Sequence, residues 1–378
     1  MNKQIMKRAG AFLLVLLMTL CCCAAQGEAL QERSFPATEQ YVKLTGRTVM
    51  ENDVRWIIHS ASTVQFRFTG TRASVVIVGD SSATGSASSR ARYAVYVNGE
   101  RVLDRTVGSR EETVEIFASD TETEVEIMIV KLSEAANSVF GIRQINVTSA
   151  GEIKPLPVKK LKIEFIGDSI TCGYGVDDEN REHHFSTETE DATRTYAWKT
   201  AMALDADCSF VSYSGHGIIS GYSGDGNKVG SQTVPAVYEL LGKNYGSAAS
   251  VIDLNQAWDF SAFRPDIVVI NLGTNDDSYT LQDAGRKEEF TLAYVEFLKM
   301  VRKNNPDALM IACLGVMGDR LYPCVKDAVM RYKEETGDEN IRPLHLPVQD
   351  GSTGYAADWH PTEATHQRVA DFLIEKLQ

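Results

Sequence analysis

The apolar pattern of this 378-residue chain changes near residue 155, and this change restricts its fold more than any other feature. Before that point, polar and apolar residues alternate in short runs. Beyond it, short apolar runs alternate with stretches of helical periodicity. Period-two alternation is typical of half-buried strands, whereas strand–helix alternation predicts a parallel sheet covered by helices. We therefore expect two domains, an N-terminal all-β sandwich and a C-terminal α/β/α domain with a central parallel sheet.

The β domain is expected over residues 35–150. Asn98-Gly99 predicts a tight hairpin, because a type I′ turn requires positive φ at both central positions. Residues 151–160 contain two prolines and are interpreted as a fairly stiff linker. The strands predicted from alternation cover residues 63–68, 93–97, 113–116 and 124–130.

The α/β domain is expected over residues 161–378. Ligands of open α/β sheets bind at the carboxyl ends of the strands, so the polar residues that follow each strand are the candidates for a site. Residues 176–195 form a polar loop soon after the first strand, and we expect this loop near the site. The predicted strands are 162–166, 209–213, 267–272, 309–314 and 341–346, and the predicted helices are 196–204, 288–303, 322–335 and 361–377.

A serine follows the first strand of this domain almost directly. Gly167-Asp168-Ser169-Ile170 comes after the apolar run 161–166, so Ser169 is expected in the turn beyond a buried strand. Such a turn can expose the serine hydroxyl to a substrate and the serine N–H to a developing oxyanion. Asp168 is expected to stabilise the turn. Ser169 is therefore the candidate nucleophile.

A serine hydroxyl is a poor nucleophile and needs a base within hydrogen-bond reach. His360 is the candidate, because Asp358-Trp359-His360-Pro361 places it in a loop just before the last predicted helix. An ordinary surface histidine is the alternative. The remaining histidines suit the role less well, since they lie in the β domain, the polar loop, a strand and a helix. His216 is expected to line the pocket rather than to act as a base.

Two further motifs supply candidates for the donors that acyl transfer needs. Ser214-Gly215-His216-Gly217 places a glycine where the backbone could approach a substrate closely. Gly273-Thr274-Asn275-Asp276 places Asn275 just after the apolar run 266–272, at the end of a strand. A glycine-rich turn and an ordinary loop asparagine are the alternative interpretations.

The order and spacing of these motifs resemble those of the SGNH hydrolases, also called GDSL-type esterases and lipases. With the preceding β domain, the block 165–175 and Asp358-Trp359-His360-Pro361 are similar to carbohydrate esterase family 2. The resemblance implies a jelly-roll domain fused to an SGNH hydrolase domain that removes acetyl groups from plant polysaccharides. It also implies an oxyanion hole formed by the backbone N–H groups of Ser169 and Gly215 and the side-chain amide of Asn275.

The acid of the triad is where this sequence departs from the SGNH pattern. SGNH proteins commonly carry aspartate three residues before the histidine, and that position here is Ala357. Asp358 lies only two residues before His360. Either Asp358 takes the role from this spacing or the protein works as a Ser–His dyad. We favour the dyad, with the carbonyl of Trp359 or a near neighbour orienting the imidazole.

Trp359 stands next to the candidate base. Aromatic faces stack on sugar rings, which would suit a glycan ligand, whereas core packing of a large apolar residue is the alternative. Trp359, Asp358 and His216 are the residues that we expect to contact the substrate.

Residues 1–27 are interpreted as an export signal, because a basic start precedes a short apolar run and small residues. Cys21-Cys22-Cys23 leaves a lipid anchor, at Cys23 or a neighbour, as an alternative to free secretion into the periplasm or medium. The four remaining cysteines lack the close paired spacing of a zinc site and are expected to be free, mostly buried thiols. We expect no metal and no cofactor.

The formal charge of −13 becomes −16 without residues 1–27, which carry three basic and no acidic side chains. This charge disfavours nucleic acids and anionic membranes as partners. We expect a monomer that acts on an acetylated polysaccharide or oligosaccharide, either xylan or glucomannan. Two alternatives are open: a lipase or thioesterase that acts on a non-carbohydrate ester, and a non-catalytic glycan-binding protein.

Overall fold

The computed structural model describes residues 29–378. The predicted export signal and the cysteines at 21–23 lie outside the described residues. Between residues 29 and 378, no helix combines the length and apolar character that a membrane span requires.

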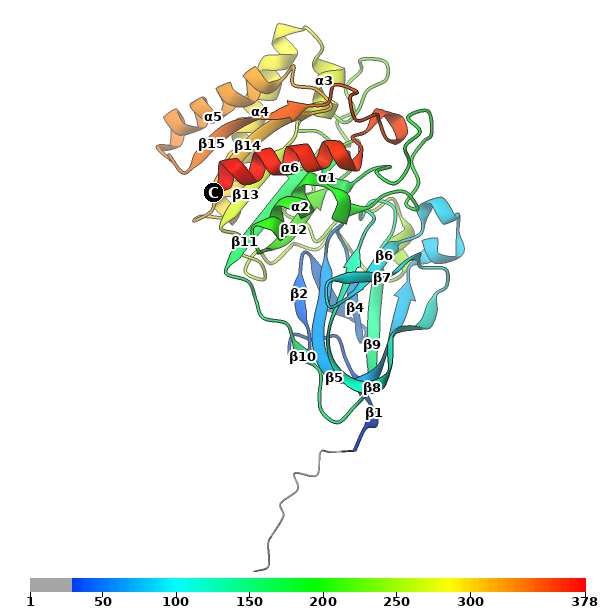
Figure 1. The fold of residues 1–378 in the computed structure, drawn as a ribbon. Helices are drawn as coiled ribbons and strands as arrows, with labels where there is room; N and C mark the ends of the chain where they lie inside the picture. Colours follow the sequence, from blue (N-terminus) through cyan, green and yellow to red (C-terminus); the bar gives the residue numbers. More distant parts are fainter. Residues whose placement is uncertain (1–28) are drawn as a thin grey trace, which may run out of the picture.

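The N-terminal domain is a curled antiparallel sheet of ten strands, with a jelly-roll-like form (Figure 1). Its strand order is β3-β4-β9-β5-β8-β6-β7, with β1 on β9 and with β2 and β10 on β5. The strands are β1 (Gln31–Phe35), β2 (Lys43–Thr45), β3 (Thr48–Glu51), β4 (Val54–Ile57), β5 (Thr63–Gly79), β6 (Arg92–Val97), β7 (Glu100–Thr106), β8 (Glu111–Lys131), β9 (Phe140–Ser149) and β10 (Lys154–Pro155). The predicted all-β domain is confirmed.

Two details differ from the pattern-based expectation. The separate strands predicted at 113–116 and 124–130 are parts of one long strand, β8, which pairs along most of its length with β5. The predicted linker carries the short strand β10, which pairs with β5. The Asn98-Gly99 hairpin joins β6 to β7 as predicted, with φ of 51° and 86° at its two residues.

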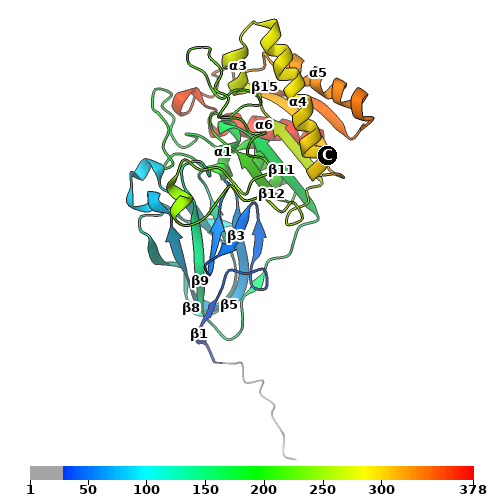
Figure 2. The same cartoon turned by 180° about the vertical axis from the view of Figure 1, so that it is seen from behind.

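The C-terminal domain holds five parallel strands in the order β12-β11-β13-β14-β15. Helices α2 and α6 cover one face, and α4 and α5 cover the other (Figures 1 and 2). The strands are β11 (Leu161–Gly167), β12 (Ala206–Ser212), β13 (Ile267–Asn271), β14 (Leu309–Val316) and β15 (Ile341–Val348). The helices are α1 (Ser169–Cys172), α2 (Tyr196–Ala203), α3 (Thr274–Thr280), α4 (Ala284–Asn304), α5 (Tyr322–Thr336) and α6 (Glu363–Leu377). The predicted parallel α/β fold is confirmed.

Short 3₁₀ turns, η1 (Ser81–Thr84), η2 (Ala87–Ser89), η3 (Ala192–Arg194), η4 (Ser247–Ser250) and η5 (Ala357–Trp359), lie in the connections. The last of them carries the residues just before His360. The α/β elements follow from local signals. Asp283 and Thr362 cap the first turns of α4 and α6, and Gly337 in the left-handed region ends α5.

The central strands are buried on both faces, which explains their nearly continuous apolar character. Along β13, Val268 and Ile270 pack into the core beneath α4 and α5, whereas Ile267 and Val269 pack into the core beneath α2 and α6. The first of these cores continues into the β domain, where it includes Trp56. Apolar packing therefore continues across the boundary between the two domains, and the β domain also has a separate core of its own.

Candidate active site

The candidate nucleophile occupies the turn where β11 ends. Ser169 is the first residue of α1, and Asp168 caps that helix by accepting a hydrogen bond from the Ile170 N–H at 3.0 Å. A Cβ on Gly167 would lie 2.1 Å from Thr171 Oγ1, so only glycine fits this turn. Burial raises the pKa of Asp168 to about 7. The turn-stabilising role expected for Asp168 agrees with this geometry.

His360 reaches the serine from the loop before α6. Its Nε2 lies 2.8 Å from Ser169 Oγ, across 191 residues of sequence. The imidazole is almost fully buried, and burial lowers its pKa to about 4, against a weaker opposing effect of nearby carbonyls and of Asp358. The ring is therefore neutral at neutral pH, and its Nε2 can accept the serine proton.

The other imidazole nitrogen faces backbone carbonyls. His360 Nδ1 lies 3.1 Å from the Ala357 carbonyl oxygen and 3.2 Å from the Asp358 carbonyl oxygen. These carbonyls are near neighbours of Trp359; the Trp359 carbonyl itself accepts from Gln349 Nε2. Bonding of Nδ1–H to carbonyls leaves the unprotonated nitrogen facing Ser169.

The backbone before His360 is held in an uncommon conformation. Asp358 and Trp359 both have positive φ, 49° and 63°, which costs free energy for residues with a Cβ. The polar loop holds this segment, because the Asp178 carbonyl accepts from the Ala357 N–H. Ala357 is fully buried, and a Cβ on Gly175 would lie 2.6 Å from its side chain. The position of the usual triad acid therefore packs closely against the glycine segment after the nucleophile.

The Asp358 carboxylate bonds to residues other than His360. One of its oxygens accepts from the Tyr174 hydroxyl, and the other lies 2.8 Å from His184 Nδ1. The Tyr174 ring stacks on the His360 imidazole, with centroids 3.9 Å apart and planes 14° apart. Asp358 thus contacts the ring that packs against the base. No role was predicted for Tyr174, although a tyrosine between two glycines after the nucleophile was a usable signal.

The segment that contains Gly215 follows β12 and is held from several sides. Gly215 has a φ of 74°, which favours glycine. The Ser214 carbonyl oxygen lies 2.9 Å from His216 Nδ1. Further along, the buried Asp276 carboxylate accepts from the N–H groups of Ile218, Ile219 and Ser220. The His216 bond holds the peptide unit that carries the Gly215 N–H, and the Asp276 bonds hold the segment that follows it.

Asn275 lies in the first turn of α3, beyond the end of β13. Its Nδ2 donates to the His216 carbonyl oxygen at 2.9 Å and, over a longer 3.4 Å, to Asp168 Oδ2. The amide is therefore tied both to the Gly215 segment and to the nucleophile turn.

These residues surround one open cavity of about 500 Å³, lined by Ser169, Tyr174, Gly215, Tyr222, Thr274, Asn275, Met317, Asp358, Trp359 and His360. Trp359 lines this cavity and is 46% exposed, so the alternative that its side chain packs in the core is wrong. The Arg181 guanidinium lies 4.1 Å from its ring centroid. His216 is 1% exposed and is not among the lining residues. The substrate contact expected for His216 does not fit this burial.

The four cysteines within the described residues are free thiols, as expected; Cys172, Cys208 and Cys313 are buried, and Cys324 is partly buried.

Comparison with known families divides the chain at the same point as the fold. Residues 165–368 match the GDSL-like Lipase/Acylhydrolase family. Residues 44–157 match the family described as Carbohydrate esterase 2 N-terminal.

Similar proteins share both domains. The chain is 32% identical to a cellulase/esterase of Acetivibrio thermocellus over 84% of its own length, and it spans only 37% of that longer protein. It is 31% identical to a family two carbohydrate esterase from Clostridium thermocellum solved with cellohexaose, with a TM-score of 0.74 and coverage of 89% of this chain and 97% of the other. An acetyl xylan esterase from the rumen bacterium Butyrivibrio proteoclasticus is 25% identical, with a TM-score of 0.81 and coverage of 92% and 98%.

Proposed function

The chain belongs to carbohydrate esterase family 2, within the GDSL-like lipase/acylhydrolase family, and we propose that it removes O-acetyl groups from plant polysaccharides by acyl transfer to Ser169. The observation that carries this proposal is the 2.8 Å contact between Ser169 Oγ and His360 Nε2 at an open cavity. Gly215 and Asn275 lie around the same cavity, so one carbonyl group could meet nucleophile and donors together.

The proposed reaction proceeds in two half-reactions. Ser169 Oγ attacks the acetyl carbonyl carbon while its proton passes to His360 Nε2. The bond between the carbonyl carbon and the sugar oxygen then breaks, and His360 returns the proton to that oxygen, leaving an acetyl-serine. Water, deprotonated by His360, attacks the carbonyl carbon of the acetyl-serine. The bond between that carbon and Ser169 Oγ then breaks, His360 returns the proton to Ser169 Oγ, and acetic acid leaves and ionises to acetate. The backbone N–H groups of Ser169 and Gly215 and the Asn275 amide stabilise the negative oxygen of each tetrahedral intermediate. Asn275 would use the Nδ2 hydrogen of its long 3.4 Å contact with Asp168, since its other hydrogen bonds the His216 carbonyl at 2.9 Å.

Asn275→Ala should lower kcat by about 10²–10³-fold and leave KM nearly unchanged, because an oxyanion donor acts mainly in the transition state. Steady-state kinetics on an acetyl ester measure both constants. Asn340, an exposed asparagine that does not line the cavity, provides the control variant Asn340→Ala. A change confined to KM would instead make Asn275 a ground-state binding residue.

The exposed ring of Trp359 supports a carbohydrate substrate. It stands at the rim of the cavity next to the proposed base, where it could stack on a sugar that carries the acetyl group. We propose acetylated xylan or glucomannan as the polysaccharide. The related family two carbohydrate esterase solved with cellohexaose and the related acetyl xylan esterase support this choice.

Acetate release from acetylated xylan, glucomannan and pectin tests the substrate class, with a long-chain p-nitrophenyl ester in parallel. We expect acetate from xylan or glucomannan and little long-chain ester hydrolysis. Preference for the long-chain ester would support a lipase or thioesterase instead. Binding of the polysaccharides without acetate release or fluorophosphonate labelling would support a non-catalytic glycan-binding protein.

The proposed substrates are polymers of the plant cell wall, which do not enter cells, and we propose that the protein is exported to act on them. The basic and apolar pattern of residues 1–27 supports export.

A further inference from the structure

A buried carboxylate of the β domain contacts the segment that carries Gly215. Glu134 lies between β8 and β9 and is 2% exposed. Its Oε2 accepts a hydrogen bond from the Ser214 backbone N–H at 2.7 Å. Ser214 directly precedes Gly215 in the chain. A β-domain side chain therefore bonds to the residue next to a proposed oxyanion donor.

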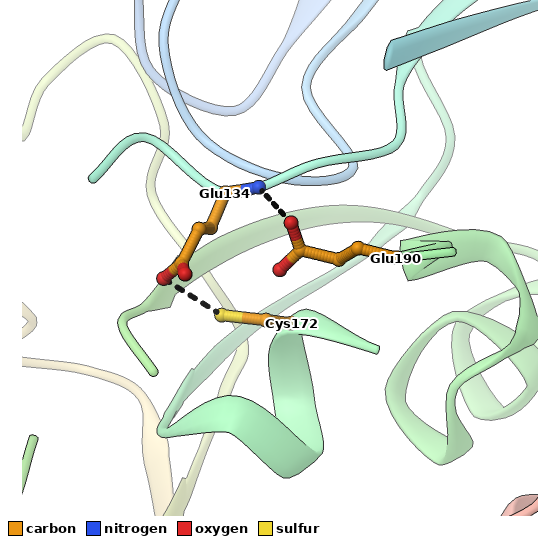
Figure 3. Close-up of side chains that lie close together, drawn as sticks. All are labelled: Glu134, Cys172 and Glu190. Carbon is orange, nitrogen blue, oxygen red and sulfur yellow. Dashed lines mark hydrogen bonds between the residues drawn. The ribbon is translucent and has the colours of Figure 1, made fainter. Parts of the chain in front are cut away.

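The same carboxylate oxygen also contacts the nucleophile turn. Cys172, the last residue of α1, donates its Sγ–H to Glu134 Oε2 at 3.7 Å (Figure 3). Burial raises the pKa of Cys172 well above its usual value, so the thiol keeps the proton that it donates. One oxygen of the β domain thus bonds to two separate segments of the active site, one that begins with Ser169 and one that contains Gly215.

Glu134 is itself held firmly. Its backbone N–H donates to Glu190 Oε2 at 2.9 Å (Figure 3). Its second carboxylate oxygen accepts from Asn137 Nδ2 at 3.1 Å. The buried Lys131 ammonium donates to the carbonyl oxygens of Ser133 and Glu134. The Glu134, Cys172 and Glu190 side chains lie close enough to ligate a metal ion. The buried Lys131 ammonium already supplies a positive charge next to these carboxylates, which disfavours a cation there.

These bonds bear on the direction of the Gly215 N–H. The Gly215 N–H and the Ser214 C=O belong to one planar peptide unit. His216 Nδ1 bonds to the carbonyl oxygen of this unit. The Glu134 carboxylate accepts from the Ser214 N–H, which belongs to the preceding peptide unit. An oxyanion hole is effective because its donors already point at the position of the oxyanion and need no reorganisation. Loss of either bond would let the unit turn.

We propose that Glu134 is a positioning residue for the oxyanion hole, so that the β domain completes the catalytic site rather than serving only as an attached module. The proposal rests on the proposed function, since it takes the Gly215 N–H as an oxyanion donor. Glu134 acts through Ser214 and touches no substrate.

The test compares Glu134→Ala with Glu134→Gln and with a matched control. Asp80→Ala is the control, because Asp80 is also a fully buried β-domain carboxylate that bonds to the other domain, at Ser247. Its backbone donors are Ser82 and Val139 rather than Ser214. Hydrolysis of p-nitrophenyl acetate, which needs no glycan, gives kcat and KM, and thermal unfolding gives Tm.

Glu134→Ala should lower kcat roughly 10–100-fold, somewhat less than removal of an oxyanion donor, with KM within about twofold of the wild type. Glu134→Gln keeps one oxygen for the Ser214 N–H and should recover a large part of the lost kcat. Asp80→Ala should lower Tm while keeping kcat within about threefold.

Equal kcat losses in Glu134→Ala and Asp80→Ala would overturn the proposal, as would a loss that appears only in KM. If Glu134→Ala does not fold, Glu134→Gln decides. Its neutral amide oxygen is a weaker acceptor than a carboxylate, so we expect this variant to keep a residual kcat loss of roughly twofold to tenfold at unchanged KM. A kcat equal to that of the wild type would overturn the proposal. Failure of the proposed function is distinguishable, because the wild-type protein would then hydrolyse neither p-nitrophenyl acetate nor acetylated glycans.

Discussion

Ser169→Ala is expected to lower kcat for an acetyl ester by roughly 10⁴–10⁶-fold, the range seen when a serine hydrolase loses its nucleophile. The physical reason is that Ser169 Oγ is the atom 2.8 Å from the His360 base at the cavity. Binding and the oxyanion donors would remain and would account for the residual rate. Folding should be unchanged, because the helix cap is supplied by Asp168 and not by Ser169.

Steady-state acetate release measures this loss, and labelling with a fluorophosphonate gives an independent reading at the same atom. Ser352→Ala, at an exposed serine in another loop, is the control and should keep both activity and labelling. Near-normal acetate release from a folded Ser169→Ala variant would contradict the proposed mechanism, whatever the activity of the other variants.

The parallel sheet was predictable because its strands are buried on both faces. The runs at 162–166 and 267–272 are nearly continuous in apolar residues, and they correspond within a residue or two to β11 and β13. The helices α2, α4, α5 and α6 were predictable from their one-sided periodicity. The four residues of α1 and the seven of α3 were not predicted, because one or two turns are too short to show a helical period.

The β domain was harder to divide into strands. β8 runs without a break through residues 119–124, which are exposed or only partly buried and where apolar alternation stops. Pairing with β5 on either side of register shifts keeps this strand continuous, and that pairing depends on residues about 50 positions away. Local alternation marks where a strand is half-buried and does not mark an exposed bend within it.

The residues of the candidate site could be predicted from the sequence, whereas the contacts that position them could not. Ser169, Gly215, Asn275 and His360 stand in motifs at strand ends, and the structure brings all four to one cavity. The contacts that hold them were not predictable. Glu134 reaches Ser214 from the other domain, 80 residues earlier in the chain. Contacts of this kind depend on how the two domains pack, and the sequence around Glu134 does not predict them.

The second large effect is expected at His360. His360→Ala should remove nearly all activity, because no other described residue lies within hydrogen-bond distance of Ser169 Oγ to take its proton. In serine proteases, loss of the triad aspartate costs about 10⁴-fold in kcat. Asp358→Ala should cost much less than that, because backbone carbonyls of residues 357 and 358 already face His360 Nδ1.

An intermediate loss at Asp358 has a specific explanation. Its carboxylate bonds to the Tyr174 hydroxyl, and the Tyr174 ring stacks on the His360 imidazole. Tyr174→Phe removes that bond while keeping the stacked ring. If Asp358 acts by bracing Tyr174, Tyr174→Phe should reproduce a large part of the Asp358→Ala loss in kcat.

Steady-state kinetics of the three variants, with circular dichroism to verify folding, separate a Ser–His dyad from a triad. A folded Asp358→Ala variant as inactive as His360→Ala would refute the dyad, since the carbonyls would then be insufficient to orient the base. A small loss at both Asp358→Ala and Tyr174→Phe would support it. The strained backbone at Asp358 and Trp359 would in that case hold two carbonyl oxygens where other hydrolases of this fold place a carboxylate.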